Sequence, residues 1–186
     1  QTVVNREVAR WRRVFANDEH WRRMQHLLTL ATMVGGIRPR SGGFEFLSGT
    51  GVSGLLPDLS VLEPEEYEAI AGARADTTLP GLQPDIVGER FVLDCLAVNG
   101  IAGQPARRLL HVAATVQPDD LCAFIIRAVQ DFPDDGAVDV LITGVPRDTD
   151  GARARWGTLV ADLVLAVHRS ADGRVQSLVE QLRALS

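Results

Sequence analysis

The chain has 186 residues, of which 46% are hydrophobic and 23% are charged, and this balance suits one ordinary globular domain or two small ones. Its 24 acidic residues outnumber its 19 basic residues, all of them arginine, so the formal net charge is −5. The absence of lysine means that this chain alone cannot form a nucleotide-binding P-loop, a Schiff-base active site or a protein-kinase active site, because each of these sites needs a lysine amine.

The first 15 residues predict an amphipathic helix. Apolar side chains recur at helical spacing at Val4, Val8, Trp11 and Phe15, and arginines occupy the opposite side. Asn17 and Asp18 interrupt the pattern, and we expect Asp18 to cap the next helix.

A second helix is predicted to run from Asp18 to the pair Gly35-Gly36. Its apolar stripe is formed by Trp21, Met24, Leu28 and Ala31. The two glycines predict a left-handed end, because glycine adopts positive φ without a steric penalty.

Residues 37–62 are interrupted by glycine and proline, and the sequence leaves open whether residues 42–56 form a wing, a helix or a loop. The spacing of Ser60, Glu63 and Pro64 then predicts another helix start, with Tyr67 and Ile70 on the apolar face.

Three Gln-Pro dipeptides, beginning at Gln83, Gln104 and Gln117, each precede a helical apolar pattern. Proline in a first helical turn costs no hydrogen bond, so we expect helices over 84–98, 105–116 and 118–131. The run 137–142 fits a strand or a helix by its period; we favour a helix because no partner strand is evident. Two more helices are expected over 153–168 and 175–185.

These elements predict a mainly α fold, in which a helical module over residues 1–82 is followed by an antiparallel helical array over residues 83–186. No apolar run approaches the roughly 18 residues of a membrane span, so no membrane partner is expected. Cys95 and Cys122 lie in apolar runs without metal-binding spacing, which indicates reduced thiols and a cytoplasmic location. Because Gln1 is neither an initiator methionine nor the start of a signal peptide, we expect a segment of a longer polypeptide.

Charge is unevenly distributed along the chain. Residues 1–40 contain eight arginines and three acidic residues, whereas the remainder contains 11 arginines and 21 acidic residues. Five arginines near Trp11 and Trp21 form a candidate interaction surface, called here the arginine strip: Arg10, Arg12, Arg13, Arg22 and Arg23. Arginine forks with indole rings suit contact with nucleic acid, but we expect both tryptophans in the core and the strip to face solvent or another domain.

Two motifs imitate catalytic sequences. Gly49-Thr50-Gly51-Val52-Ser53-Gly54 matches the dinucleotide fingerprint, but Pro57 prevents the helix that this fingerprint requires, so we expect a glycine-rich turn. The same stretch lacks the glycine spacing of a nucleophile elbow, which makes a hydrolase based on Ser53 the weakest hypothesis.

No cofactor or metal site is expected. His20 and His26 are six residues apart, about 240° around a helix, so they cannot share a metal ion as an i, i+4 pair would. Carboxylates cluster at Asp131, Asp134, Asp135 and Asp139, and we expect them to cap helices and to face solvent.

Three segments carry a family resemblance. Arg10-Trp11-Arg12-Arg13 resembles the R-x-W-R-R helix, and Leu28–Gly36 resembles the L-A-L-A-T-L-x-G-G helix end, both found behind the ATPase core of bacterial NACHT-like STAND NTPases. Leu82–Leu93 is similar to the L-x-P-D-x-x-G-E-x-x-V-L helix that follows in the same proteins. The resemblance covers residues 6–98 in matching order and implies a winged-helix-like module followed by a TPR-like array.

In that family such a module acts as a hinge beside the nucleotide-binding domain. The phosphate-binding lysine and the acidic Walker B residues of the family have no counterpart here, so the resemblance implies a non-catalytic regulatory segment that packs on other domains of its parent chain or on protein partners. The alternative is a winged-helix module that binds nucleic acid through its first 40 residues.

Overall fold

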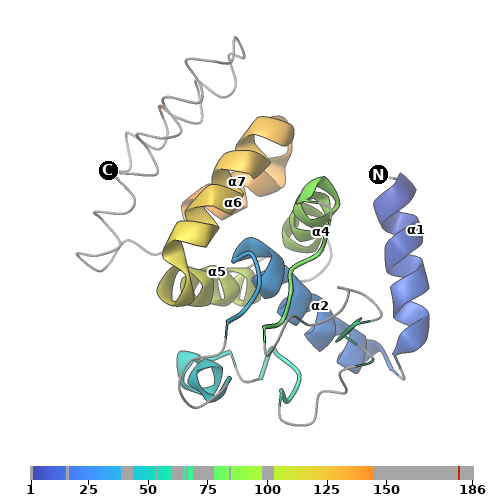
Figure 1. Cartoon of the computed structure of the whole chain (residues 1–186). Coiled ribbons are helices and arrows are strands. Elements are labelled where there is room, and N and C mark those ends of the chain that lie inside the picture. Colours follow the sequence, from blue (N-terminus) through green and yellow to red (C-terminus); the bar gives the residue numbers. More distant parts are fainter. Residues whose placement is uncertain are drawn as a thin grey trace.

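The computed structural model describes residues 2–15, 17–38, 44–52, 54–59, 65, 67–68, 78–83, 85–97, 103–144 and 180. Within these ranges the chain is mainly helical, as the sequence predicts, and β-structure is limited to one isolated bridge. Six α-helices lie in them (Figure 1), with bounds α1 Thr2–Trp11, α2 Asp18–Met33, α4 Asp85–Ala97, α5 Gln104–Val116, α6 Pro118–Asp131 and α7 Gly136–Gly144.

Helix α1 is shorter than predicted. It ends at Trp11, residues Arg12–Val14 tighten into a 3-10 turn, and Phe15 is extended with φ −97° and ψ 136°. Phe15 therefore does not continue the helical stripe. Its ring instead packs against Trp21 at a centroid distance of 5.1 Å, which joins the start of α2 to the end of α1.

The cap of α2 is Asn17, so the expectation of Asp18 as the cap is wrong by one residue. The Asn17 side chain accepts a hydrogen bond from the backbone N–H of His20 at 2.7 Å, and Asp18 lies in the first turn, where a negative charge suits the helix dipole. At the other end the Gly36 N–H donates to the Ala31 carbonyl at 2.7 Å. Gly35 and Gly36 have φ of 62° and 105°, which confirms the predicted left-handed end.

The segment after α2 turns through short irregular structure. The described part of 42–56 contains a 3-10 helix, Glu45–Thr50, which ends at Gly51 with φ 74°. The turn expected over 49–54 is therefore described at Gly51 and Gly54, whereas Gly49 and Thr50 end the 3-10 helix. Ser53 lies outside the described residues.

Ile37 and Leu79 form an antiparallel bridge with two backbone hydrogen bonds, and this bridge fixes the segment 78–83 beside the end of α2. The Leu82 N–H donates to the Thr32 hydroxyl at 3.1 Å. Tyr67, which is helical and fully buried, donates from its hydroxyl to the Pro80 carbonyl at 2.6 Å. The expected helix after Ser60 is thus described at Glu65, Tyr67 and Glu68, whereas Ser60 to Pro64 and Ile70 lie outside the described residues.

The three helices that follow the Gln-Pro dipeptides are confirmed within one or two residues as α4, α5 and α6, and the run 137–142 is a helix, α7. The helices expected over 153–168 and 175–185 lie outside the described residues, apart from the helical Glu180. Among the described helices, none is long and apolar enough to cross a bilayer.

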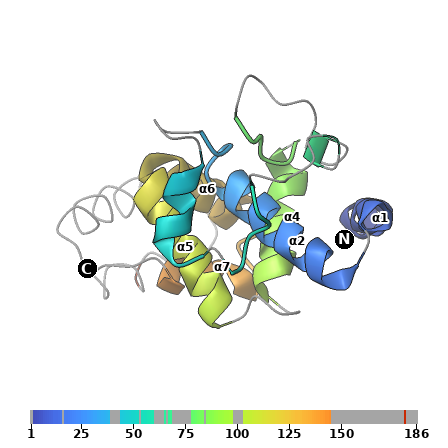
Figure 2. The same ribbon diagram turned by 90° about the horizontal axis from the view of Figure 1, so that it is seen from below.

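Helix α4 lies at the centre of the arrangement. Figure 2 shows it beside α2, with α1 on one side and α5 to α7 on the other. Its side chains are apolar on most of its circumference, which is the pattern of a helix surrounded by protein, and Phe91, Val92, Leu93 and Leu96 are almost fully buried. Buried residues before and after residue 82 belong to one continuous core.

Candidate functional site

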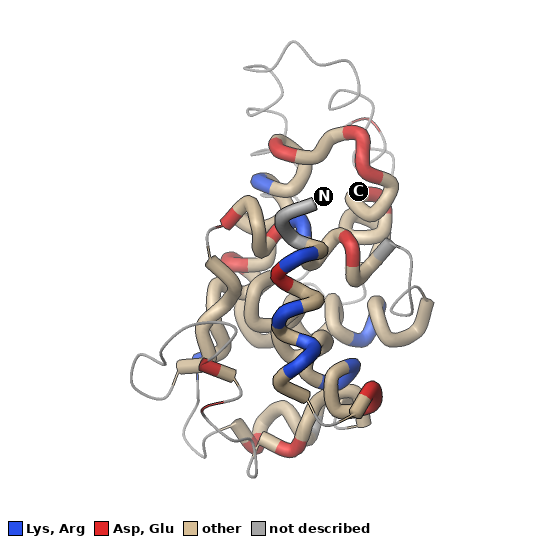
Figure 3. Tube along the Cα trace, turned by 90° about the vertical axis from the view of Figure 1, so that its right-hand side faces the viewer, with Lys and Arg blue, Asp and Glu red and all other residues tan. Residues whose placement is uncertain are grey.

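The arginine strip lies along α1, the 3-10 turn and the first turns of α2. Figure 3 shows basic positions following the helix at the N-terminus, whereas acidic positions are spread over several parts of the molecule. Three of the five strip arginines are paired with acidic neighbours: Arg10 with Glu7, Arg12 with Asp18, and Arg23 with Glu19. Arg13 and Arg22 are exposed and have no ion pair in the described part of the chain.

The tryptophans near the strip are buried, as expected. Trp11 and Trp21 are 4% and 6% exposed, and Trp11 meets the edge of Phe91 on α4 with ring centroids 5.9 Å apart. Bases could not stack on these rings without the helices coming apart. The strip therefore offers a charged face without a stacking platform, which suits an acidic protein surface better than a single-stranded nucleic acid.

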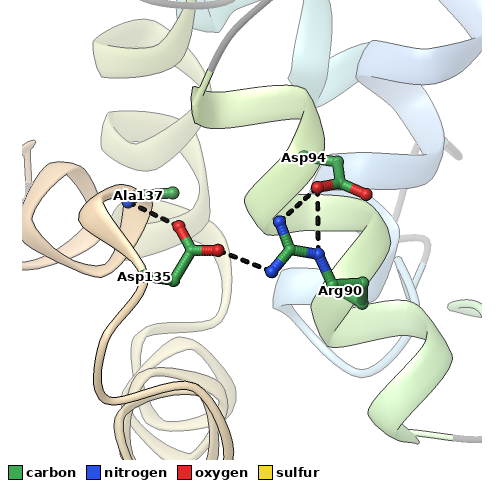
Figure 4. A network of polar contacts seen from close by, with 4 residues as sticks. All are labelled: Arg90, Asp94, Asp135 and Ala137. Atoms are coloured by element: carbon green, nitrogen blue, oxygen red, sulfur yellow. Dashed lines mark hydrogen bonds and ion pairs between the residues drawn. The ribbon is translucent and has the colours of Figure 1, made fainter. Parts of the chain in front are cut away.

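A second polar cluster lies between helices. The sequence predicted a capping role for Asp135, but the contact between Asp135 and Arg90 was missed. Arg90 on α4 donates two hydrogen bonds to Asp94 one turn later and one to Asp135 at 2.5 Å (Figure 4). The other oxygen of Asp135 accepts from the Ala137 N–H at 2.8 Å, so Asp135 caps α7. The arginine of α4 is thereby fixed to the start of α7.

The surroundings of Arg90 favour its charged form. The carboxylate of Asp94 and then that of Asp135 raise the pKa of Arg90, which outweighs the effect of partial burial. The guanidinium also lies over the Phe132 ring at 5.6 Å from its centroid. Within the described residues two carboxylates bind its guanidinium and the Phe132 ring covers it, so Arg90 holds helices together.

Glu89, the residue before Arg90, binds a different helix. One of its carboxylate oxygens accepts from Nε of Arg127 on α6 at 2.9 Å, and its side chain is only 1% exposed. A carboxylate within the apolar pattern of 86–96 was the one sequence signal for this contact, since a buried charge is rarely left without a partner. The partner, 38 residues away, could not be deduced from spacing.

Gln117 connects the end of α2 to the start of α6. Its amide nitrogen donates to the Val34 carbonyl at 2.8 Å and to Asp120 at 2.9 Å, and its amide oxygen accepts from the Arg38 N–H at 3.3 Å. The sequence assigned a role only to the proline of each Gln-Pro dipeptide. The hydrogen bonds of the Gln117 side chain, called here the clamp to Val34, were therefore also missed.

Two further groups have shifted pKa values: His26, which is buried, and Cys95, which is partly buried against the core. His26 Nδ1 lies 2.9 Å from the Leu55 carbonyl, and burial lowers the pKa of this histidine. Burial raises the pKa of the Cys95 thiol to about 12, so it is an inert core thiol at neutral pH. In the described ranges no three His, Cys, Asp or Glu side chains are placed to hold a metal ion.

Comparison with known proteins gives no match to a family model, to a curated protein or to a solved structure.

Proposed function

We propose that this chain is a non-catalytic regulatory segment of a multidomain signalling NTPase, and that it relays ligand sensing through the packing between domains. The observation that carries the proposal is the branching of contacts at three consecutive residues of α4. Glu89 binds α6, Arg90 binds the start of α7, and Phe91 meets Trp11 of α1. A displacement of α4 would therefore be transmitted to three helices at once.

The arrangement of the described polar side chains fits a segment that transmits movement between helices better than it fits an active site. The buried ones satisfy helix ends and bind neighbouring helices, and they do not converge on a common point where a reacting atom could sit. The resemblance of residues 6–98 to the region behind the ATPase core of NACHT-like STAND NTPases points to the same class of function.

In this proposal residues 1–82 form a winged-helix-like hinge and residues 83–186 begin a TPR-like array. The bridge between Ile37 and Leu79 supports the first, since it returns the chain to the end of α2. The contacts among the successive helices α5, α6 and α7 support the second. The exposed face of the arginine strip is the surface that would pack on an acidic neighbouring domain.

The test uses the complete protein encoded by the gene. We expect it to bind and hydrolyse ATP in a magnesium-dependent manner, and we expect the isolated 186-residue chain to show no turnover above buffer. Arg13→Glu with Arg22→Glu should change the unstimulated turnover of the complete protein several-fold, because charge reversal weakens docking of the strip. Arg107→Glu, an exposed arginine on α5, is the matched control and should leave turnover unchanged.

Two results would refute the proposal. One is turnover by the isolated chain that a point mutation abolishes. The other is duplex DNA binding by the isolated chain that weakens steeply with salt and disappears in the Arg13→Glu, Arg22→Glu variant, which would assign the strip to nucleic acid.

A further inference from the structure

The carboxylate of Glu89 is buried at the contact between α4 and α6 with only one of its two oxygens bound. Oε1 accepts from Arg127, whereas Oε2 is buried and has no hydrogen-bond partner among the described groups. An ionised carboxylate ordinarily accepts several hydrogen bonds, and burying one of its oxygens without a hydrogen bond costs free energy. The surroundings of Glu89 therefore disfavour its ionised form.

Arg127 cannot compensate Glu89 completely because it is shared. Its Nε lies 4.0 Å from Asp85 as well as 2.9 Å from Glu89, and its side chain is 41% exposed to water. Asp131 follows Arg127 by one turn of α6 and acts on Glu89 as a second negative charge. Glu89 and Asp85 thus share one half-exposed guanidinium, and Asp131 adds a further negative charge near Glu89.

Among the described residues, the other helices packed on α4 bring no cation to Glu89. The contact from α1 is the apolar pair Trp11 and Phe91, and the charged contact from α7 is Asp135, which is occupied by Arg90. From α2, Thr32 approaches Gly88, and the buried His26 is bound to the loop at Leu55. The charged groups that act directly on Glu89 are therefore Arg127 and Asp131, and Asp85 lies near the same Arg127.

We propose that Glu89 makes the contact between α4 and α6 sensitive to protons: the neutral carboxyl holds the two helices together, and its ionisation loosens them. Burial is the largest of the causes that raise the pKa of Glu89 to about 7, and the carboxylate of Asp131 adds to it.

The direction in which stability changes with pH follows from the linkage between proton binding and folding. In the unfolded chain a glutamate titrates near its ordinary value of about 4.3, so between that pH and about 7 the folded state holds the extra proton. The stabilisation is fully present below the unfolded pKa and is lost as the pH rises through the folded pKa. The contribution of Glu89 to the stability of the folded chain is therefore larger at mildly acidic pH than at neutral pH.

The experiment compares the 186-residue chain with Glu89→Gln, which keeps the shape of the side chain and cannot ionise. We expect the ratio of their folding constants, from denaturant unfolding, to fall about 10- to 100-fold for the native chain between about pH 5 and about pH 8. Hydrogen-exchange protection factors should fall more in α6 than in α2 over the same range. Parallel stability profiles of the two proteins, or equal losses of protection in α2 and α6, would overturn the proposal.

A second measurement keeps the proposal testable if Glu89→Gln does not fold. Carbon NMR of the glutamate carboxyls should give a titration midpoint for Glu89 well above that of the exposed glutamates. Asp131→Asn should move this midpoint down, while Asp119→Asn, at the far end of α6, should leave it in place. A midpoint for Glu89 near the ordinary glutamate value would overturn the proposal.

Discussion

Glu89 and Arg90 are adjacent on α4, yet their side chains bind different helices: Glu89 binds Arg127 of α6, and Arg90 binds Asp135 at the start of α7. Successive residues of an α-helix point about 100° apart, so two neighbours reach two different partners when the helix is surrounded. The orientation of α4 about its own axis is fixed by this pair.

The two roles of Asp135 can be separated by substitution. Asp135→Ala removes both the cap of α7 and the partner of Arg90, and we expect it to lower the free energy of unfolding by about 3 kcal/mol, because both side chains are only 17% exposed. Asp135→Asn keeps an oxygen for the cap and loses only the charge, so about half of that loss is expected. Denaturant unfolding measures both values, and equal losses would show that the cap contributes nothing.

Gly88 lies where α4 closely approaches both the end of α2 and Leu82. A Cβ at this position would lie 2.8 Å from the Leu82 carbonyl oxygen and 2.8 Å from the Thr32 methyl group. Although alanine is the better helix former, we expect Gly88→Ala to destabilise the chain by about 1–3 kcal/mol, because the backbone must move. In Gly136→Ala the new Cβ meets nothing within 4 Å, so this control should be neutral or slightly stabilising. Equal thermal stability of the two variants would contradict the close approach.

The helices of the fold could be predicted from the sequence because the information is local. Apolar residues at helical spacing, proline in the first turn and the glycine pair after α2 determined α2 and α4 to α6 within one or two residues. The errors were also local. Phe15 fits the helical stripe, but its contact with Trp21 requires the chain to turn at Arg12, and Asn17 and Asp18 are equally good caps until the entry direction is known.

The contacts between helices could not be predicted in the same way. Arg90 and Asp94 are visible as an i, i+4 pair, but the partner that caps α7, Asp135, is 45 residues away and depends on how the helices pack. The arginine strip could be placed from periodicity, whereas its partial neutralisation by Glu7, Asp18 and Glu19 depends on side-chain directions that a sequence does not give.

His26 should destabilise the chain at acidic pH. The Leu55 carbonyl can only accept, so Nδ1 carries the proton and the buried Nε2, which has no partner in the described region, is unprotonated. Because burial lowers the pKa of His26, the unfolded chain takes up the proton first, and stability is lost as the pH falls below about 6.5.

The matched pair for this prediction is His26→Gln, which cannot titrate, and His111→Gln, which removes an exposed histidine on α5. Denaturant unfolding at several pH values should give a flatter profile between about pH 7 and about pH 5 for His26→Gln only. If the native chain and His26→Gln lost stability in parallel, His26 would not be the titrating group.

Gln117 and Gln104 belong to the same kind of dipeptide but should differ in their contribution to stability. Gln117→Ala leaves the Val34 carbonyl and the Arg38 N–H without their partner where α2 meets α6, and we expect a loss of about 1–3 kcal/mol. Gln104 is exposed, and within the described part of the chain its side chain binds Arg108 alone, at 3.2 Å, so Gln104→Ala should cost about 0.5 kcal/mol or less. Thermal or denaturant unfolding of the two variants measures the difference. A loss of similar size at both positions would mean that the glutamine acts through the helix start that the two dipeptides share, and that the clamp to Val34 contributes little.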